Sequence, residues 1–107
     1  MPVRMDKPWL ALSDIDGRIH GNLGVFELAN AQDEVVFIGY AGGNSLYGLK
    51  GEVAAAGAAC ADAEQVRVEV NTAYLSRYRE LLMAYLADHG NLPQYNTEMP
   101  PGRLSPA

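Results

Sequence analysis

The chain has 107 residues, which is enough for one small domain with its own hydrophobic core. Its 13 acidic and 8 basic side chains give a formal net charge of −5, and this sign argues against binding nucleic acid through a broadly basic surface. The single cysteine, Cys60, excludes an internal disulfide and suits a reducing compartment. Because no apolar run is long enough to span a membrane and the N-terminus lacks the apolar core of a signal peptide, we expect a soluble cytoplasmic protein.

Residues 1–23 are predicted to form an N-terminal arm in front of the folded core. The first seven residues are typical of a loose leader, and a short apolar run that starts at Pro8 follows them. The only tryptophan, Trp9, lies in that run. Its large apolar ring is expected either to anchor the arm across the core or to act as a stacking platform for a base or another ligand. Residues 13–22 carry several aspartates and glycines and are typical of a loop.

A hairpin is the main pattern at the start of the core. Side chains alternate along residues 24–29, a polar break occupies residues 30–33, and a β-branched and aromatic run follows at residues 35–38. A break this short, made of turn-forming residues, predicts two antiparallel strands. Gly39 closes the second strand and residues 42–45 form a glycine turn, so a ligand could approach the backbone at this edge.

A helix and a third strand are expected after the hairpin. Residues 45–61 are helical by composition in their second half, and Gly57 is a point where this helix would end or kink. Residues 66–70 alternate between valines and charged side chains. This alternation predicts a half-buried strand whose valines face the core, while Arg67 and Glu69 face water.

The last helix is predicted over residues 73–89, with Asn71 or Thr72 as its cap and Gly90 as its stop. Apolar side chains recur in it at three- and four-residue spacing, which predicts a buried stripe. The stripe consists of Leu75, Tyr78, Leu82, Tyr85 and Leu86.

Together these elements predict an α+β fold, with a small three-stranded antiparallel sheet flanked by helices. The arm covers residues 1–23, the core covers residues 24–96, and a proline-rich tail that we expect to be extended or disordered covers residues 97–107. The sequence contains no Cys and His cluster with zinc spacing and no phosphate loop of the Walker kind. Such common metal and nucleotide sites are therefore not expected.

Two tripeptides in the hairpin resemble the signature of a nuclease superfamily. The first, GVF, begins at Gly24 and includes Phe26; the second, FIG, begins at Phe37 and ends at Gly39, with ten residues between the two. They are similar in type and spacing to the two signature tripeptides of the GIY-YIG nucleases. The order of the predicted elements also agrees with that family, and the resemblance covers residues 24–96.

The resemblance implies a fold, an activity and a metal. Members of the GIY-YIG superfamily have a three-stranded antiparallel sheet flanked by helices, and they cleave DNA phosphodiesters with one divalent metal ion, here Mg²⁺ or Mn²⁺. The glutamate of the late helix holds that metal, and Glu80 matches it in this sequence. The asparagine that ends the family core is matched by Asn96.

The chain departs from the GIY-YIG pattern at the positions that carry the chemistry. Family enzymes have a tyrosine in each tripeptide, whereas this chain has Phe26 and Phe37, and a phenyl ring cannot move a proton. The arginine that steadies the scissile phosphate is also missing, and the nearest cation is Lys50. A lost contact of that kind costs about 3 kcal/mol of transition-state stabilisation. Tyr40 and Tyr47 are the candidates to replace the missing tyrosines of the tripeptides.

Two functional hypotheses follow. The first is a divalent-metal-dependent DNA endonuclease with a rearranged site, in which Glu80 binds the metal, Lys50 contacts the phosphate, and Tyr40 or Tyr47 handles the proton. The second is a binding or interaction module that has lost the chemistry, whose former cleft holds a peptide, a small molecule or another subunit, such as a second copy in a homodimer. The missing hydroxyls, the missing arginine and the acidic net charge favour the binding module. A nuclease predicts a positive stripe beside the hairpin and Glu80 exposed in a cleft, whereas a binding module predicts an apolar or acidic patch there.

Overall fold

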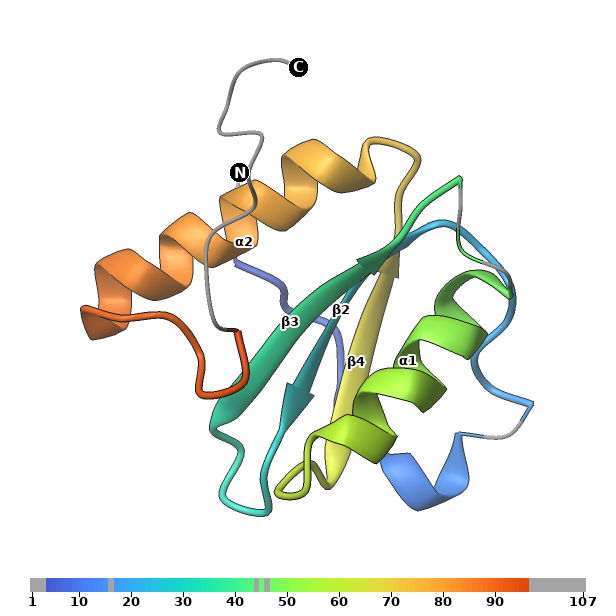
Figure 1. Cartoon of the computed structure of the whole chain (residues 1–107), viewed down its shortest axis with the longest axis horizontal. Coiled ribbons are helices and arrows are strands. Elements are labelled where there is room, and N and C mark those ends of the chain that lie inside the picture. The colour runs from blue at the N-terminus through green and yellow to red at the C-terminus, as the bar shows by residue number, and fades with distance from the viewer. Residues whose placement is uncertain (1–3, 16, 44, 46, 97–107) are drawn as a thin grey trace.

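The computed structural model describes residues 4–15, 17–43, 45 and 47–96. In chain order they form β1 (Leu10–Ala11), the 3-10 turn η1 (Leu12–Asp14), β2 (Gly24–Ala29), β3 (Val35–Ala41), α1 (Gly48–Ala59), β4 (Gln65–Val70) and α2 (Tyr74–His89). The strands of the described residues make one antiparallel sheet in the order β1-β4-β2-β3. Figure 1 shows α1 and α2 on opposite faces of this sheet, so each face is covered by one helix.

The predicted α+β architecture is confirmed, but the predicted number of strands is wrong. In the part of the chain that the structure describes, the sheet has four strands, because β1 pairs with β4 through Leu10↔Val66 and Ala11↔Gln65. A strand of two residues has no alternation that a sequence pattern can reveal, and its partner lies far along the chain. β1 covers the end of the β4 edge at Gln65 and Val66.

The predicted hairpin is confirmed as β2 and β3. The side-chain oxygen of Asn30 accepts hydrogen bonds from the backbone N–H groups of Gln32 and Glu34, each at 2.9 Å, and Asp33 has a φ of 65°. The pairing also contains a bulge, because Leu28 pairs with Phe37 whereas the next residue of β2 pairs with Val35. The extra residue in β3 is Val36, and it joins the same apolar cluster as Phe37.

Two apolar clusters hold the helices against the sheet. On the α1 side, Phe26 and Leu28 of β2 pack with Leu49 and Val53 of the helix. On the α2 side, the buried cluster consists of Met5, Val25, Ile38, Leu81 and Leu82. Because consecutive residues of β2 point to opposite faces and both faces are covered, every residue of that strand is buried.

The predicted helix is present as α1, which begins at Gly48, earlier than the second half of residues 45–61, and continues through Gly57 to Ala59 instead of ending at Gly57. The predicted orientation of β4 needs a correction. Arg67 and Glu69 do not face water, because they lie on the side of the sheet that α2 covers and form ion pairs there. The last valine of the strand, Val70, is 62% exposed instead of facing the core. Alternation identified the strand but not which of its faces a helix would cover.

α2 runs from Tyr74 to His89 and ends at Gly90, whose φ is 84°, as predicted. Its buried stripe is shifted from the predicted one. Leu75 and Leu86 are exposed, and Leu81 takes the buried place beside Leu82. Rotation of a helix about its axis by one position still buries an apolar stripe of this width. Spacing alone therefore did not distinguish the predicted stripe from the observed one.

The start of the chain also packs more closely than a loose leader would. Met5 is buried in the α2-side cluster, and the Arg4 guanidinium donates hydrogen bonds of 2.7 and 2.5 Å to the carboxylate of Asp88. The ring of Trp9 lies 4.2 Å from the guanidinium carbon of Arg67, a contact consistent with the anchor interpretation. The predicted tail, residues 97–107, lies outside the described residues. None of the described helices is long and apolar enough to cross a membrane.

Candidate functional site

A cleft of about 610 Å³ opens along the outer edge of β3 and reaches around both sides of that strand. Toward α1, its described walls include Phe26, Phe37 and Glu52. Toward α2, they include Tyr40, Tyr74, Leu75 and Tyr78. The cleft therefore lies where the hairpin, the glycine turn and both helices meet.

Glycines in this cleft let aromatic rings lie directly against the backbone. A Cβ atom at Gly39 would lie 2.5 Å from Cζ of Phe26 and 2.8 Å from Cε2 of Phe37. A Cβ atom at Gly42 would lie 2.6 Å from Cε1 of Tyr74. Both positions are glycine because aromatic rings occupy the space that a side chain would need.

The aromatic rings form two groups, one on each side of β3. The ring centroids of Phe26 and Phe37 are 5.9 Å apart on the α1 side. On the α2 side, the ring of Tyr40 stacks on Tyr74 at 5.8 Å and tilts against Tyr78 at 4.8 Å. Tyr40 therefore points to the opposite face from Phe37, as the alternation of the strand predicts. Burial and the neighbouring Tyr40 raise the pKa of the Tyr78 hydroxyl, which stays protonated at neutral pH.

Glu52 supplies the charge of the cleft. Its Oε2 accepts a 2.8 Å hydrogen bond from the hydroxyl of Ser45, and that hydroxyl oxygen in turn accepts a bond from the N–H of Gly42 at 3.0 Å. The N–H of Gly43 donates to the hydroxyl of Tyr74 at 3.1 Å. No lysine, arginine or histidine is among the described residues that line the cleft. The site is thus aromatic, with one carboxylate and no cation.

Four of the residues singled out from the sequence meet in this cleft, namely Phe26, Phe37, Gly39 and Tyr40. Asn96 lies beside it, on the edge of β3. Its Oδ1 accepts a 2.8 Å hydrogen bond from the N–H of Ile38, and its Nδ2 donates a 2.9 Å bond to the carbonyl of the same residue. Gly24 has a structural role in β2, because a Cβ there would collide with the backbone oxygen of Glu69 on β4.

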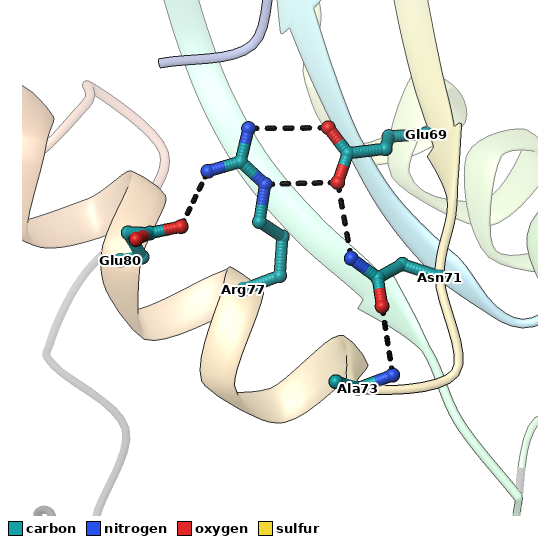
Figure 2. Close-up of polar contacts among 5 residues, drawn as sticks. All are labelled: Glu69, Asn71, Ala73, Arg77 and Glu80. Atoms are coloured by element: carbon teal, nitrogen blue, oxygen red, sulfur yellow. Dashed lines mark hydrogen bonds and ion pairs between the residues drawn. The ribbon is translucent and has the colours of Figure 1, made fainter. Parts of the chain in front are cut away.

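Glu80, Tyr47 and Lys50 are not among the residues that line the cleft. Figure 2 shows that the guanidinium of Arg77 lies between Glu80, at 2.6 Å, and Glu69, at 2.9 and 3.1 Å. Glu80 is thus an ion-pair partner of Arg77 through its Oε1, on a side chain that is 45% exposed. The described residues contain no group of three or more His, Cys, Asp or Glu side chains that could hold a metal ion.

Ionised side chains also lie under α2. The Arg77 guanidinium and the amide of Asn71 hold the pKa of the Glu69 carboxyl below its usual value. Glu27 is nearly fully buried on the same face, and its Oε1 accepts a hydrogen bond from Nε of Arg67 and forms an ion pair with Nη2 of the same guanidinium. These pairs connect β2, β4 and α2 and do not open into the cleft along β3. Cys60 is buried, and burial raises the pKa of its thiol, which is typical of a structural cysteine.

Four residues of the cleft were not predicted as site residues from the sequence, namely Glu52, Ser45, Tyr74 and Tyr78. Glu52 lies in an alanine-rich segment whose composition favours a packing helix, and Tyr78 falls on the predicted buried stripe of the last helix. The available signal was that Glu52 is the only acidic residue of α1. A lone acidic residue in a helix indicates a site only when the position of α1 beside β3 is known.

Residues 1–88 match the model of a protein family described as a domain of unknown function, DUF7508. The chain belongs to this family. The DUF7508 match includes all strands described above, α1 and nearly all of α2. It ends before Asn96, so the carboxamide that binds the edge of β3 lies outside the matched region. No curated protein and no solved structure matches the chain.

The contact of Asn96 with the DUF7508 region gives a testable prediction. We expect Asn96→Ala to lower the free energy of unfolding by about 2–3 kcal/mol, because two hydrogen bonds are lost and both backbone groups of Ile38 are left without a protein partner. Urea unfolding followed by circular dichroism would measure this change. The matched control is Asn91→Ala at an exposed position, which should cost less than about 0.5 kcal/mol. Equal costs for the two variants would contradict the role given to Asn96.

Proposed function

We propose that this DUF7508 domain is a binding module, and that the cleft along β3 holds an apolar or cationic group of a partner molecule. The observation that carries the proposal is the composition of the cleft. The described lining has five aromatic side chains, one carboxylate and no cation, and two of the aromatic side chains, Phe26 and Phe37, stand where the GIY-YIG resemblance implies tyrosines.

Electrostatics in the cleft disfavour a phosphodiester as its ligand. Glu52 repels a phosphate, and Lys50 is not among the residues that line the cleft. Neither Phe26 nor Phe37 carries a hydroxyl that can take a proton from an attacking water. Stabilisation of the charge that develops on a phosphate is usually the largest catalytic contribution, and the described lining of the cleft has no lysine or arginine to supply it.

The same composition suits an organic group of neutral or positive charge. The cleft volume of about 610 Å³ falls within the range of about 300–1,000 Å³ that is typical of ligand sites. Aromatic faces such as those of Tyr40 and Tyr74 attract cations as well as apolar groups. Glu52 then adds a full negative charge on the α1 side.

Two small probes of matched size test this proposal, phenethylamine and phenylacetate. We expect phenethylamine to shift the amide NMR signals of Gly39, Gly42 and Gly43, whereas phenylacetate at the same concentration shifts them much less. Glu52→Gln should remove most of this preference, because it replaces the carboxylate with a neutral group of the same shape. Binding of phenylacetate as strong as that of phenethylamine would contradict the proposal.

A cleavage assay tests the competing enzyme hypothesis. Purified protein and a Glu80→Ala variant are incubated with single-stranded, double-stranded and branched DNA in the presence of Mg²⁺ or Mn²⁺. We expect no cleavage and no salt-sensitive DNA binding by either protein. Cleavage by the parent that disappears in Glu80→Ala would overturn the binding module and support a nuclease in which Glu80, Lys50 and Tyr40 or Tyr47 act.

A further inference from the structure

The outer edge of β3 has a regular direction of hydrogen bonding. In an antiparallel pair, residues alternate between those whose N–H and C=O point to the neighbouring strand and those whose groups point away. Both groups of Ile38 point away from β2, since they bind the carboxamide of Asn96. Tyr40 lies two residues further along the same strand, so its N–H and C=O also point outward.

Most of this outer edge is already occupied by the chain itself. The carbonyl of Val36 accepts a 2.9 Å hydrogen bond from Tyr95, and Asn96 binds Ile38. Beyond the strand, Gly42 donates its N–H to the hydroxyl of Ser45 and accepts a 3.0 Å bond from the N–H of that residue. Tyr40 lies between these positions. On the outer side of β3, neither its N–H nor its C=O has a hydrogen bond to another described residue.

We propose that the backbone of Tyr40 is the docking point for a short extended peptide segment of a partner protein. The segment would donate to the carbonyl of Tyr40 and accept from its N–H, as the carboxamide of Asn96 does at Ile38. Asn96 demonstrates that an amide fits this edge in the required orientation. The inference rests on the proposed function, because the docking point lies inside the cleft.

The walls of the cleft define the side chains of this segment. In a paired strand, the residue opposite Tyr40 points to the same face as Tyr40, and its two neighbours point to the other face. The central side chain would therefore meet Tyr74 and Leu75, which favours an apolar residue. The flanking side chains would lie on the α1 side near Glu52, which favours lysine or arginine.

Charge also selects between classes of occupant. A nucleic acid strand lacks the backbone amide donors of a peptide, and its phosphates would meet Glu52. A second copy of this chain carries the same acidic cleft and a net charge of −5, so charge complementarity does not favour symmetric pairing. A basic extended peptide satisfies the two backbone groups and the carboxylate together.

The probe is the acetylated and amidated peptide Thr-Lys-Leu-Lys-Thr, added to the full-length chain labelled with ¹⁵N. We expect it to shift the amide signal of Tyr40 and to slow hydrogen exchange there. N-methylation of the central leucine should weaken binding about fivefold or more, because it removes the donor to the Tyr40 carbonyl. Replacement of both lysines by glutamate should abolish detectable binding.

The outcomes separate this inference from the proposed function. If phenethylamine binds the cleft but the peptide and its N-methylated form bind equally well, the docking point at Tyr40 is wrong and the binding module stands. If neither phenethylamine nor the peptide binds, both proposals fail. Peptide binding that appears only after deletion of residues 97–107 would overturn the inference and assign the edge to the chain's own segment.

Discussion

Replacing Glu27 with alanine is expected to lower the free energy of unfolding by about 3–5 kcal/mol. Glu27 is 5% exposed in the central strand β2, and Nε and Nη2 of Arg67 lie 2.8 and 2.7 Å from its Oε1. Alanine would leave the guanidinium of Arg67 beneath α2 without its carboxylate, and an unpaired cation in that place is costly. Urea unfolding monitored by circular dichroism measures the loss.

The control is the double variant Glu27→Leu with Arg67→Met, which removes both charges and keeps apolar contact with the ring of Trp9. We expect its stability to lie within about 1–2 kcal/mol of the parent, since a buried ion pair replaced as a whole by apolar side chains is often neutral or stabilising. If the double variant is as unstable as Glu27→Ala, the cost does not come from an unpaired Arg67.

Glu27 also gives a signed pH dependence. Burial raises the pKa of its carboxyl above the ordinary value, and Arg67 offsets only part of this effect. The folded protein therefore holds the proton more tightly than the unfolded chain, so Glu27 adds stability as the pH falls through its folded pKa. Glu27→Gln removes this gain, and we expect its cost to be larger at about pH 5 than at about pH 7. A cost that decreases toward acid would show that the pKa of Glu27 is lowered.

Phe26→Ala should be comparably damaging, at about 3–5 kcal/mol. The ring is 1% exposed, packs in the cluster that joins α1 to the sheet, and also lines the cleft. Removing it leaves a cavity in the core as well as a wider cleft. The chain has only two phenylalanines, so Phe37 provides the matched control.

Phe37 is half-buried on the same side of β3, and we expect Phe37→Ala to cost about 1–2 kcal/mol. Its main effect should be on the cleft, where phenethylamine binding weakens in a protein that remains folded. If both variants lose the same stability, the distinction between a core position and a cleft position fails. Chemical denaturation measures the loss of stability, and the NMR titration with phenethylamine measures the loss of binding.

Local patterns predicted the elements whose cause is local. The hairpin turn depends on Asn30 binding its own neighbours, and the end of α2 depends on a left-handed residue at Gly90. Both signals are contained in a few consecutive residues. They were predicted with nearly correct boundaries for this reason.

Features that depend on distant partners were not predicted. β1 exists because Leu10 and Ala11 pair with β4, and a run of two residues contains no pattern that predicts this pairing. Arg67 and Glu69 alternate with valines as an exposed face would, yet α2 covers them and their charges are paired there. Alternation reports that two faces differ, but not which one meets a helix.

The residues of the candidate site fall into the same two groups, those placed by local sequence and those placed by distant packing. The two tripeptides placed Phe26, Phe37 and Gly39 together because hairpin register is a local property. Glu52 and Tyr74 reach the cleft from α1 and α2, whose positions depend on packing. Short motifs therefore located the cleft, and the packing of the helices determined its charge.

The short segment after α2 has a consequence for solubility. An outer strand with open backbone groups at Val36, Ile38 and Tyr40 would be a template for intermolecular sheets. Tyr95 and Asn96 occupy the first two of these positions. Among the described residues, Tyr40 is then the one of these three positions without a hydrogen bond at the outer edge, and a single open residue is too short to seed a growing sheet. Loss of this segment is expected to open all three positions and to make the edge prone to form intermolecular sheets.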